Sequence, residues 1–281
     1  MKKIVTSING RIVTGKEASI SVYDNSLLYA EGLFETFLAI DDRLAFPKEH
    51  FIRLRKGAAL VGLRLPVTES KLIIWLKKTA RAHPARLKRL RLTITGGESA
   101  VWTGQRGDSQ VICSAVEHKF DNSPLKLYAP ESKIDERLVF NRIKTISYGP
   151  KAAALREAQK NKCDDALLIN GSGNISELTS ANIFWTKKNK IYTPPVTAGC
   201  LEGVTRKLIL SEAKRNRWQI IEKNCSLKEL KSAGEVFSSS SVRLVRAVGE
   251  IRAKNYIAKF ETGPMSAIIF KRICEILDFY E

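Results

Sequence analysis

The chain has 281 residues, of which 44% are hydrophobic and 27% are charged, the balance of an ordinary globular protein long enough for two domains. No apolar run approaches the ~20 residues that a transmembrane helix needs, and no apolar signal core follows the first lysines. Five scattered cysteines without a Cys-x-x-Cys pair argue against a disulfide framework and a zinc site, and they favour a reducing cytoplasm.

The net charge of +18 is the unusual figure in the composition. Lys and Arg cluster at residues 86–91 and 187–190, and such clusters can bind nucleic acid. A nucleic-acid reader usually adds a recognisable module, and this sequence contains none. We therefore interpret the charge as a solvated basic surface that also attracts anionic substrates and cofactors, and we expect neither a nucleic acid nor a membrane as a partner.

The N-terminal third predicts antiparallel strands. Residues 3–8 and 11–13 flank Asn9-Gly10, a dipeptide that favours a tight hairpin turn. Residues 33–40 and 43–46 flank Asp41-Asp42, a second hairpin signal.

Helices follow, then a further strand. Pro47 opens a helix whose apolar positions recur at helical spacing as far as Val61, and residues 72–79 predict another helix. Residues 90–95 alternate as a strand with one buried face. A polar run around residues 118–126 marks a domain boundary, which divides the chain into 1–120 and 121–281.

The second part mixes both kinds of element. Helices are expected from Pro150 to about Asn161, from near Gly203, and from about Pro264 to Leu277. Strands are expected at 165–169, 181–185 and 190–192, separated by turns. Because helices and strands do not alternate as regular βαβ units, the sequence predicts an α+β fold.

Most general enzyme motifs are absent. The sequence has no Gly-x-Ser-x-Gly, no phosphate-binding Gly-Lys-Ser/Thr, no His-Glu-x-x-His, and no Gly-x-Gly-x-x-Gly after a strand. His50, His83 and His118 are the only histidines, and His50 beside Phe51 is read as a packing residue. The sequence therefore offers few candidate ligands for a metal-centred mechanism.

Three segments carry possible chemistry. Lys144 lies in a strand-like segment, 142–145; it is either a surface group or a buried amine that can form a Schiff base. Residues 199–206 place backbone N–H groups at a helix start, a natural phosphate cradle. Residues 238–241 are four serines after an apolar strand; they form either a serine-rich turn or a set of hydroxyls for an anion.

Taken together and in order, these segments resemble the class IV aminotransferase family, the fold-type IV pyridoxal-phosphate enzymes. The segments that carry the resemblance are 27–36, 50–54, Lys144-Thr145 with Tyr148, 175–184, 192–195, 201–206 and 235–237. The resemblance implies two α+β domains, with the cofactor in the interdomain cleft and the catalytic lysine in the larger C-terminal domain. It also implies a homodimer in which the loop near Tyr29 reaches the neighbouring subunit's site.

Pyridoxal 5′-phosphate is the cofactor that the resemblance implies. Lys144 corresponds to the lysine that forms the aldimine and shuttles protons, and Glu177 to the carboxylate that pairs with the pyridine nitrogen. Tyr148 corresponds to the tyrosine near the cofactor's 3′ oxygen and the lysine. The groups that correspond to the phosphate site are Arg53, the amides of Val204 and Thr205, and the hydroxyls of Ser240 and Ser241.

The substrate site departs from the family. Many members carry an arginine for the substrate carboxylate before the glycine that ends the strand at 90–95, but here the strand ends Thr95-Gly96-Gly97. We predict that Arg106 replaces it, with Tyr29 and Gly96 also in the substrate site. The expected function is an aminotransferase acting on a small amino acid and a 2-keto acid.

Two alternatives remain. One is 4-amino-4-deoxychorismate lyase, which the run Ser240-Ser241-Val242-Arg243 resembles more closely. The other is a basic nucleic-acid-binding protein on an inactive scaffold.

Overall fold

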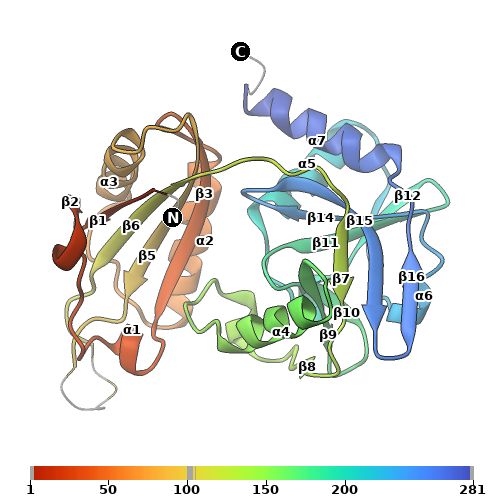
Figure 1. Ribbon diagram of the computed structural model, residues 1–281, viewed down its shortest axis with the longest axis horizontal. Coiled ribbons are helices and arrows are strands. Elements are labelled where there is room, and N and C mark those ends of the chain that lie inside the picture. Colours follow the sequence, from red (N-terminus) through yellow and green to blue (C-terminus); the bar gives the residue numbers. More distant parts are fainter. Residues whose placement is uncertain (1–2, 100–103, 105, 279–281) are drawn as a thin grey trace. The chain divides into compact units, whose positions relative to one another are not determined.

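The computed structural model describes residues 3–99, 104 and 106–278, and it divides into two compact units (Figure 1). The first comprises the described part of Met1–Phe120 together with Ile143–Ser147, and the second comprises Asp121–Arg142 and the described part of Tyr148–Glu281. We had expected Lys144 in the C-terminal domain, but its segment groups with the first unit. The reason is backbone pairing, because Phe34 N donates to Lys144 O at 2.9 Å and Ile146 N donates to Gly32 O at 3.1 Å.

The first unit is built on an antiparallel sheet. In the described part of the chain its strand order is β2-β1-β6-β5-β3-β4. The strands are β1 (Ile4–Ile8), β2 (Arg11–Val13), β3 (Gly32–Ile40), β4 (Arg43–Leu44), β5 (Leu87–Thr95) and β6 (Val111–Glu117). The short helix α1 (Asn25–Leu28) precedes β3, and both predicted hairpins are confirmed.

Two helices pack on this sheet. Helix α2 (Pro47–Leu60) starts with proline in its first turn and buries Phe51 and Leu54. Helix α3 (Glu69–Arg81) is capped by Thr68, whose hydroxyl accepts a hydrogen bond from Lys71 N. Both helices were predicted, and α2 contacts β3 while α3 contacts β1, β5 and β6.

The second unit holds a larger, mixed sheet. Its order among the described residues is β10-β9-β7-β15-β14-β11-β12-β13, with β16 paired to β15 and β8 to β9. The strands are β7 (Leu125–Tyr128), β8 (Lys133–Ile134), β9 (Asp165–Asn170), β10 (Ile175–Leu178), β11 (Asn182–Lys187), β12 (Lys190–Thr193), β13 (Ile220–Glu222), β14 (Glu235–Ser240), β15 (Leu244–Ala253) and β16 (Tyr256–Lys259). The predicted strands at 165–169, 181–185 and 190–192 are confirmed.

Helices α4 (Gly149–Lys160), α5 (Val204–Arg215) and α7 (Pro264–Ile276) confirm the three that we predicted here. Helix α4 contacts β9 and β7, α5 contacts β14, and α7 contacts β15 (Figure 1). A short helix, α6 (Leu227–Leu230), is closed by a capping box between Ser226 and Glu229.

The segment 142–145 is not the strand that we predicted. A 3₁₀ turn, η2 (Val139–Arg142), is followed by a single bridge between Thr145 and Leu33. One bridge is all that forms because the chain pairs with only the beginning of β3 before α4 begins. The serine run also differs, since Ser238 to Ser240 belong to β14 rather than to a turn.

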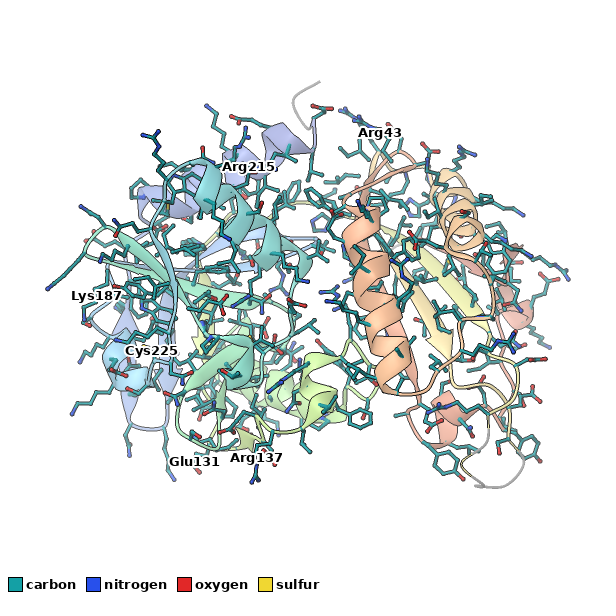
Figure 2. The ribbon with its side chains drawn as sticks, turned by 180° about the vertical axis from the view of Figure 1, so that it is seen from behind. Arg43, Glu131, Arg137, Lys187, Arg215 and Cys225 are labelled. Carbon is teal, nitrogen blue, oxygen red and sulfur yellow. The ribbon has the colours of Figure 1, made fainter. Side chains whose placement is uncertain are left out.

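Basic side chains are spread over the surface of each unit. Arg43, Arg137, Lys187 and Arg215 are exposed and come from different elements (Figure 2). The labelled Cys225 is buried, as are the other four cysteines, and all five are free. Among the described residues, no helix has both the length and the apolar character that a membrane span requires.

Candidate active site

Lys144 lies against an aromatic ring in the first unit. Its Nζ is 4.4 Å from the centroid of the Phe34 ring, and the guanidinium carbon of Arg91 is 3.7 Å from the same centroid. The Lys144 side chain is half-buried, and its backbone is fixed by the bonds to β3 described above. The lysine is therefore held in a defined place on an apolar surface rather than extended into solvent.

The Arg53 guanidinium binds the buried carboxylate of Glu35. Its Nε donates to Glu35 Oε1 at 2.8 Å and its Nη2 donates to Glu35 Oε2 at 2.6 Å. The Arg53 side chain is only 11% exposed, so it is not one of a row of solvated basic residues on α2. This bidentate pair is a strong, geometrically specific contact.

His50 completes this cluster and packs against Phe37, with the two rings tilted by 43°. Its Nδ1 lies 2.7 Å from Glu35 Oε2, and its ring centroid lies 4.4 Å from that of Phe37. Burial raises the pKa of Glu35, but Arg53 and then His50 outweigh burial and lower it to about 2. Burial lowers the pKa of His50 despite the neighbouring carboxylate. His50 is therefore a neutral, hydrogen-bonded packing residue, as its place beside Phe51 suggested.

Glu177 is the buried carboxylate of the second unit. It lies in β10, is 3% exposed, and accepts two hydrogen bonds. Its Oε1 accepts from Lys151 Nζ at 2.7 Å, and its Oε2 accepts from Leu201 N at 3.1 Å. Sequence reasoning identified Glu177 but missed Lys151, because nothing in the α4 sequence shows which of its lysines faces β10.

Tyr148 precedes α4 and is fixed at its tip. Its hydroxyl donates to the backbone oxygen of Thr179. Lys151, one turn further along, lies with its Nζ 5.6 Å from the centroid of the Tyr148 ring. The tyrosine, the lysine and Glu177 therefore form one group within the second unit.

The N-terminus of α5 has no side-chain cap. Gly203 is the N-cap residue, followed by Val204 and Thr205 in the first turn. A Cβ at Gly203 would lie 2.1 Å from Asn182 Oδ1, so a larger residue there would displace the Asn182 side chain. The Thr205 hydroxyl is buried and has no hydrogen-bond partner among the described residues. Uncapped amides beside an unsatisfied hydroxyl form an arrangement suited to an anion.

The serine run lies close to this helix start. Ser239 pairs in register with Asn182, whose Nδ2 donates to Leu201 O at 2.9 Å. In the described part of the chain, the buried Ser239 hydroxyl has no partner. The Ser240 hydroxyl accepts from Arg243 N at 3.2 Å, and Ser241 is half-buried. We predicted Ser240 and Ser241, and the unpartnered hydroxyl makes Ser239 a candidate as well.

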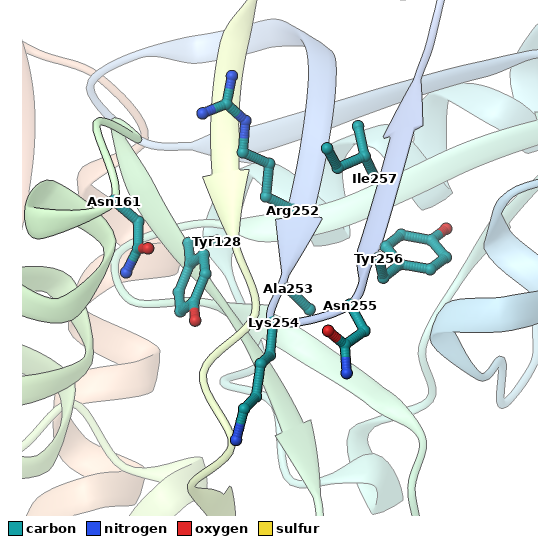
Figure 3. Close-up of a pocket in the computed structure, with 8 residues that line it drawn as sticks. All are labelled: Tyr128, Asn161, Arg252, Ala253, Lys254, Asn255, Tyr256 and Ile257. Carbon is teal, nitrogen blue, oxygen red and sulfur yellow. The ribbon is translucent and has the colours of Figure 1, made fainter.

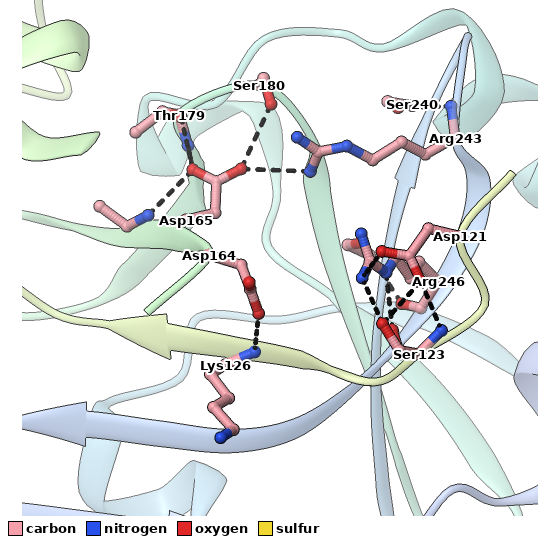
Figure 4. A network of polar contacts seen from close by, with 12 residues as sticks. Asp121, Ser123, Lys126, Asp164, Asp165, Thr179, Ser180, Ser240, Arg243 and Arg246 are labelled. Atoms are coloured by element: carbon pink, nitrogen blue, oxygen red, sulfur yellow. Dashed lines mark hydrogen bonds and ion pairs between the residues drawn. The ribbon is translucent and has the colours of Figure 1, made fainter. Parts of the chain in front are cut away.

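Arg243 contacts a buried aspartate rather than solvent alone. Its Nη1 lies 3.3 Å from Asp165 Oδ2 (Figure 4). The same carboxylate accepts hydrogen bonds from the hydroxyls of Thr179 at 2.5 Å and Ser180 at 3.2 Å. This network links β9, the turn after β10 and the turn after β14.

The predicted substrate residues lie in the first unit. Arg106 donates from Nε to Glu31 Oε2 at 2.8 Å, and from Nη1 to the backbone oxygens of Val61 and Gly62 at 2.8 and 2.9 Å. Gly96 is buried, and a Cβ there would lie 2.9 Å from the Glu31 Cβ. Tyr29, at the end of α1, is exposed.

A pocket of about 360 Å³ lies elsewhere in the second unit (Figure 3). It is lined by Tyr128, Asn161, Arg252, Ala253, Lys254, Asn255, Tyr256 and Ile257. No predicted site residue lines it. Within the described residues, no group of three or more His, Cys, Asp or Glu side chains is arranged to hold a metal ion.

Comparison with known proteins gives consistent matches along the chain. Residues 32–251 match the family model described as amino-transferase class IV. A putative branched-chain-amino-acid aminotransferase of Methanocaldococcus jannaschii is 28% identical over 249 residues, which cover 87% of this chain and 86% of the relative. The aminodeoxychorismate lyase of Bacillus subtilis is 27% identical over 255 residues, which cover 89% and 87%.

The fold is also found among solved structures. The branched-chain aminotransferase of Thermoproteus uzoniensis, solved with norvaline, superposes with a TM-score of 0.89 at 23% identity. The alignment covers 99% of this chain and 95% of that one.

Proposed function

The chain belongs to the class IV aminotransferase family, whose members are pyridoxal-phosphate enzymes, and from this premise we propose that it is an aminotransferase. The proposed reaction moves an amino group between a small amino acid and a 2-keto acid. The observation that carries the proposal is the pair of buried hydroxyls, Thr205 and Ser239, which have no partner among the residues that the structure describes and which lie beside the uncapped start of α5. Buried hydroxyls without partners are costly, and a bound phosphate group satisfies them.

The remaining predicted residues fit the same cofactor. We propose that the amides of Val204 and Thr205 bind the phosphate together with Arg53 and the serines of the run Ser239–Ser241. Glu177, buried and acceptor-only when ionised, is suited to the pyridine nitrogen. Lys144 is the amine proposed to bond to the cofactor's carbonyl carbon.

Lys144 is also the residue proposed to transfer the substrate proton. The bound cofactor withdraws electrons from the substrate's α-carbon. Lys144 Nζ would accept the proton that leaves that carbon and would move it during transfer of the amino group. Tyr148, whose hydroxyl donates to Thr179 O, is proposed to lie near the 3′ oxygen of the bound cofactor. The Phe34 ring keeps one side of the lysine apolar.

The half-reaction tests the proposal. The purified protein with its cofactor is mixed with single amino acids, both L and D, without any keto acid. We expect the absorbance of the bound aldehyde form to disappear, because an aminotransferase passes the amino group to the cofactor and releases a keto acid. Pyridoxamine 5′-phosphate recovered after denaturation would account for the loss, and a protein that retains its aldehyde absorbance with every amino acid contradicts the proposal.

The second candidate function is lysis of 4-amino-4-deoxychorismate to pyruvate and 4-aminobenzoate. Thr95-Gly96-Gly97, which lacks an arginine, and the sequence Ser240-Ser241-Val242-Arg243 favour it. The similarity to the Bacillus subtilis lyase supports it as well. Release of pyruvate from that compound, without pyridoxamine 5′-phosphate forming from amino acids, would decide for the lyase.

A substrate carboxylate requires a cation, and we propose Arg106 for this task, with Arg243 as the second candidate. Replacing whichever of these two arginines binds the carboxylate with alanine should raise the KM for the amino acid at least about tenfold. The reason is that a hydrogen bond to a charged group is worth roughly 1.5–3 kcal/mol. The dissociation constant for pyridoxamine 5′-phosphate should stay unchanged. Arg106→Lys, which keeps the charge, is the control for damage to the Glu31 contact. If neither alanine variant changes KM, the carboxylate is bound elsewhere.

We also propose that the enzyme works as a homodimer in the cytoplasm. Tyr29 lies among exposed apolar side chains that include Val22, Tyr23, Leu27 and Leu28, and such a patch supports association with a second copy. Free cysteines support a reducing compartment. The dispersed basic side chains of each unit support a solvated surface rather than a nucleic-acid site. Tyr29 and Gly96 remain our proposed substrate contacts.

A further inference from the structure

We propose that the pocket drawn in Figure 3 is a binding site for a small organic carboxylate with an apolar body, separate from the candidate active site. Its volume of about 360 Å³ falls within the range of roughly 300–1,000 Å³ that is usual for small-molecule sites. The inference goes beyond the proposed function and does not depend on it, because the residues assigned to the cofactor and the substrate do not line this pocket.

The lengths of two elements separate the pocket from the candidate active site. Strand β15 begins at Leu244, next to Arg243, and Arg252 lies eight residues further along the same strand. At about 3.3 Å per residue, this separation is roughly 26 Å. Helix α4 has Tyr148 at its N-cap and Asn161 at its C-cap. The pocket therefore lies at the far ends of two elements whose beginnings belong to the candidate active site.

A row of three side chains on neighbouring strands lines the pocket. Arg252 in β15 pairs in register with Tyr128 in β7 and with Ile257 in β16. Register partners on adjacent strands project from the same face of a sheet, so the arginine stands between a phenol ring and an aliphatic side chain. Asn161, from the end of α4, and Lys254, from the turn after β15, complete the polar part of the lining (Figure 3).

The Arg252 guanidinium is oriented but not fully hydrogen-bonded. Its Nε donates to Glu250 Oε1, and in the part of the chain that the structure describes neither Nη group has a partner. The arginine side chain is 37% exposed, which leaves these groups accessible. Two adjacent Nη donors match the two oxygens of a carboxylate.

The two tyrosines of the lining differ in the same respect. The Tyr128 hydroxyl has no hydrogen-bond partner among the described residues, although its side chain is half-buried. The Tyr256 hydroxyl, in contrast, donates to Leu227 O at 2.9 Å. Tyr128 therefore supplies a further donor to the pocket, and Tyr256 does not.

The charge of the lining favours an anion. Arg252 and Lys254 are cationic, and none of the residues that the structure places in the lining is acidic. Lys254 Nζ lies 3.2 Å from Glu131 Oε1, but the two side chains are 71% and 73% exposed, so this pair is weak. A ligand carboxylate can therefore share Lys254 while it binds Arg252.

The nearby helix end does not cancel this preference. The C-terminus of α4 carries partial negative charge, which disfavours an anion. The carbonyls of residues 157–159, however, accept hydrogen bonds from the backbone N–H groups of residues 161–163. The arginine thus remains the dominant charge, and it also disfavours a ligand ammonium group. A carboxylic acid or a keto acid fits the pocket better than an amino acid does.

The apolar part of the lining selects the body of the ligand. Ile257 is 60% exposed and lies in the same row as the Tyr128 ring. Covering these apolar atoms is favourable, and inorganic phosphate would leave them in water. The pocket therefore fits a carboxylate on an aromatic or branched aliphatic body better than it fits a free phosphate ion.

Photolabelling of the full chain tests the location of the site. The protein is irradiated with 4-azidobenzoate, a carboxylate on a photoreactive aromatic body, in the presence of pyridoxamine 5′-phosphate, and the labelled peptides are mapped. We expect label in the segments 126–128 and 252–257. Because mapping locates the label directly, the result does not depend on whether pyridoxamine 5′-phosphate binds. Label around Lys144 or Tyr148 with none at the pocket overturns the inference.

Protection from labelling tests the chemical class. Benzoate should protect the two segments, and benzamide, which has a similar shape without the charge, should need at least about a tenfold higher concentration. Tenfold is the lower end of the effect of one hydrogen bond to a charged group. Inorganic phosphate should protect less well than benzoate. Equal protection by benzoate and benzamide overturns the inference.

Variants of the lining test the assigned contacts. Arg252→Gln should raise the half-protecting concentration of benzoate by at least about tenfold. Lys254→Gln should raise it by about two- to fivefold, because this lysine is exposed. Lys259→Gln is the matched control, since Lys259 is exposed and pairs in register with Glu250 but does not line the pocket. It should keep the wild-type value.

Tyr128→Phe keeps the test decisive if Arg252→Gln loses stability. It removes only a hydroxyl and leaves the contact between Arg252 and Glu250 in place, and we expect about a fivefold higher half-protecting concentration. Thermal denaturation of each variant reports its fold. A folded Arg252→Gln with the wild-type half-protecting concentration overturns the inference, as does an unchanged value in both Tyr128→Phe and Lys254→Gln.

Discussion

We expect Lys144→Ala to abolish covalent attachment of pyridoxal 5′-phosphate and to lower turnover by about 10²–10⁴-fold, the usual contribution of a positioned proton-transfer group. The reason is that Lys144 is proposed both to bond to the cofactor and to move the substrate proton. The measurement is borohydride reduction of the loaded protein followed by peptide mapping. The pyridoxyl group is expected on Lys144 in the wild type and on no lysine in the variant.

The fold should survive this exchange. Lys144 is half-buried, and its segment is held to β3 by backbone bonds that alanine keeps, so we expect a loss of no more than about 1 kcal/mol of unfolding free energy. Lys48→Ala, on the exposed face of α2, is the control and should retain both label and activity. A label on any other lysine of the wild type would refute the assignment of Lys144.

Arg53→Ala should have two separable effects. It leaves the buried Glu35 carboxylate without its cation, which costs about 3–5 kcal/mol of unfolding free energy. It should also loosen pyridoxal 5′-phosphate by roughly 10–150-fold, if Arg53 contacts the phosphate as proposed. Urea denaturation of the cofactor-free protein measures the first effect, and equilibrium dialysis measures the second.

The double variant Glu35→Gln with Arg53→Met separates these effects. It removes both charges of the buried pair, so the unfolding free energy should largely recover while the cofactor stays loosely bound. If affinity recovers together with stability, Arg53 has only a structural role.

The pH dependence of stability provides a further check on the same pair. Glu35 has a pKa of about 2 in the folded protein, below its usual 4.5. A lowered pKa means that the stabilisation is present above the usual value and is lost as pH falls toward 2. Arg53→Ala should therefore flatten the fall of stability in that acid range.

The helices were predictable where a local signal defined them. Pro47, Pro150 and Pro264 stand in the first turns of α2, α4 and α7, and proline fits that position because it lacks the N–H that would be unpaired there. Strand β15 was missed, since Arg246, Gly249 and Glu250 interrupt its apolar pattern. It forms because its sequence neighbours β14 and β16 pair with it on opposite stretches and because β7, which is distant in sequence, pairs with it as well.

The sequence indicated which residues make up the candidate site, but it did not indicate which other side chains those residues contact. Family resemblance pointed to Lys144, Glu177 and Thr205, since chemistry fixes which side chains a cofactor needs. Resemblance did not show that Arg53 is paired with Glu35 or that Glu177 is paired with Lys151. Such pairs depend on which elements pack together, and local patterns do not carry that information.

Because Ile143–Ser147 belong to the first unit, the position of a chain break decides whether each fragment keeps its own contacts. A fragment that ends at residue 120 would contain every strand of its sheet yet lose the segment that bonds to Gly32 and Phe34. A fragment that starts at residue 121 would carry those five residues without the strand they bond to. No single cut therefore yields two self-sufficient pieces, and hybrid enzymes made by exchanging halves between relatives need crossovers on both sides of residues 143–147.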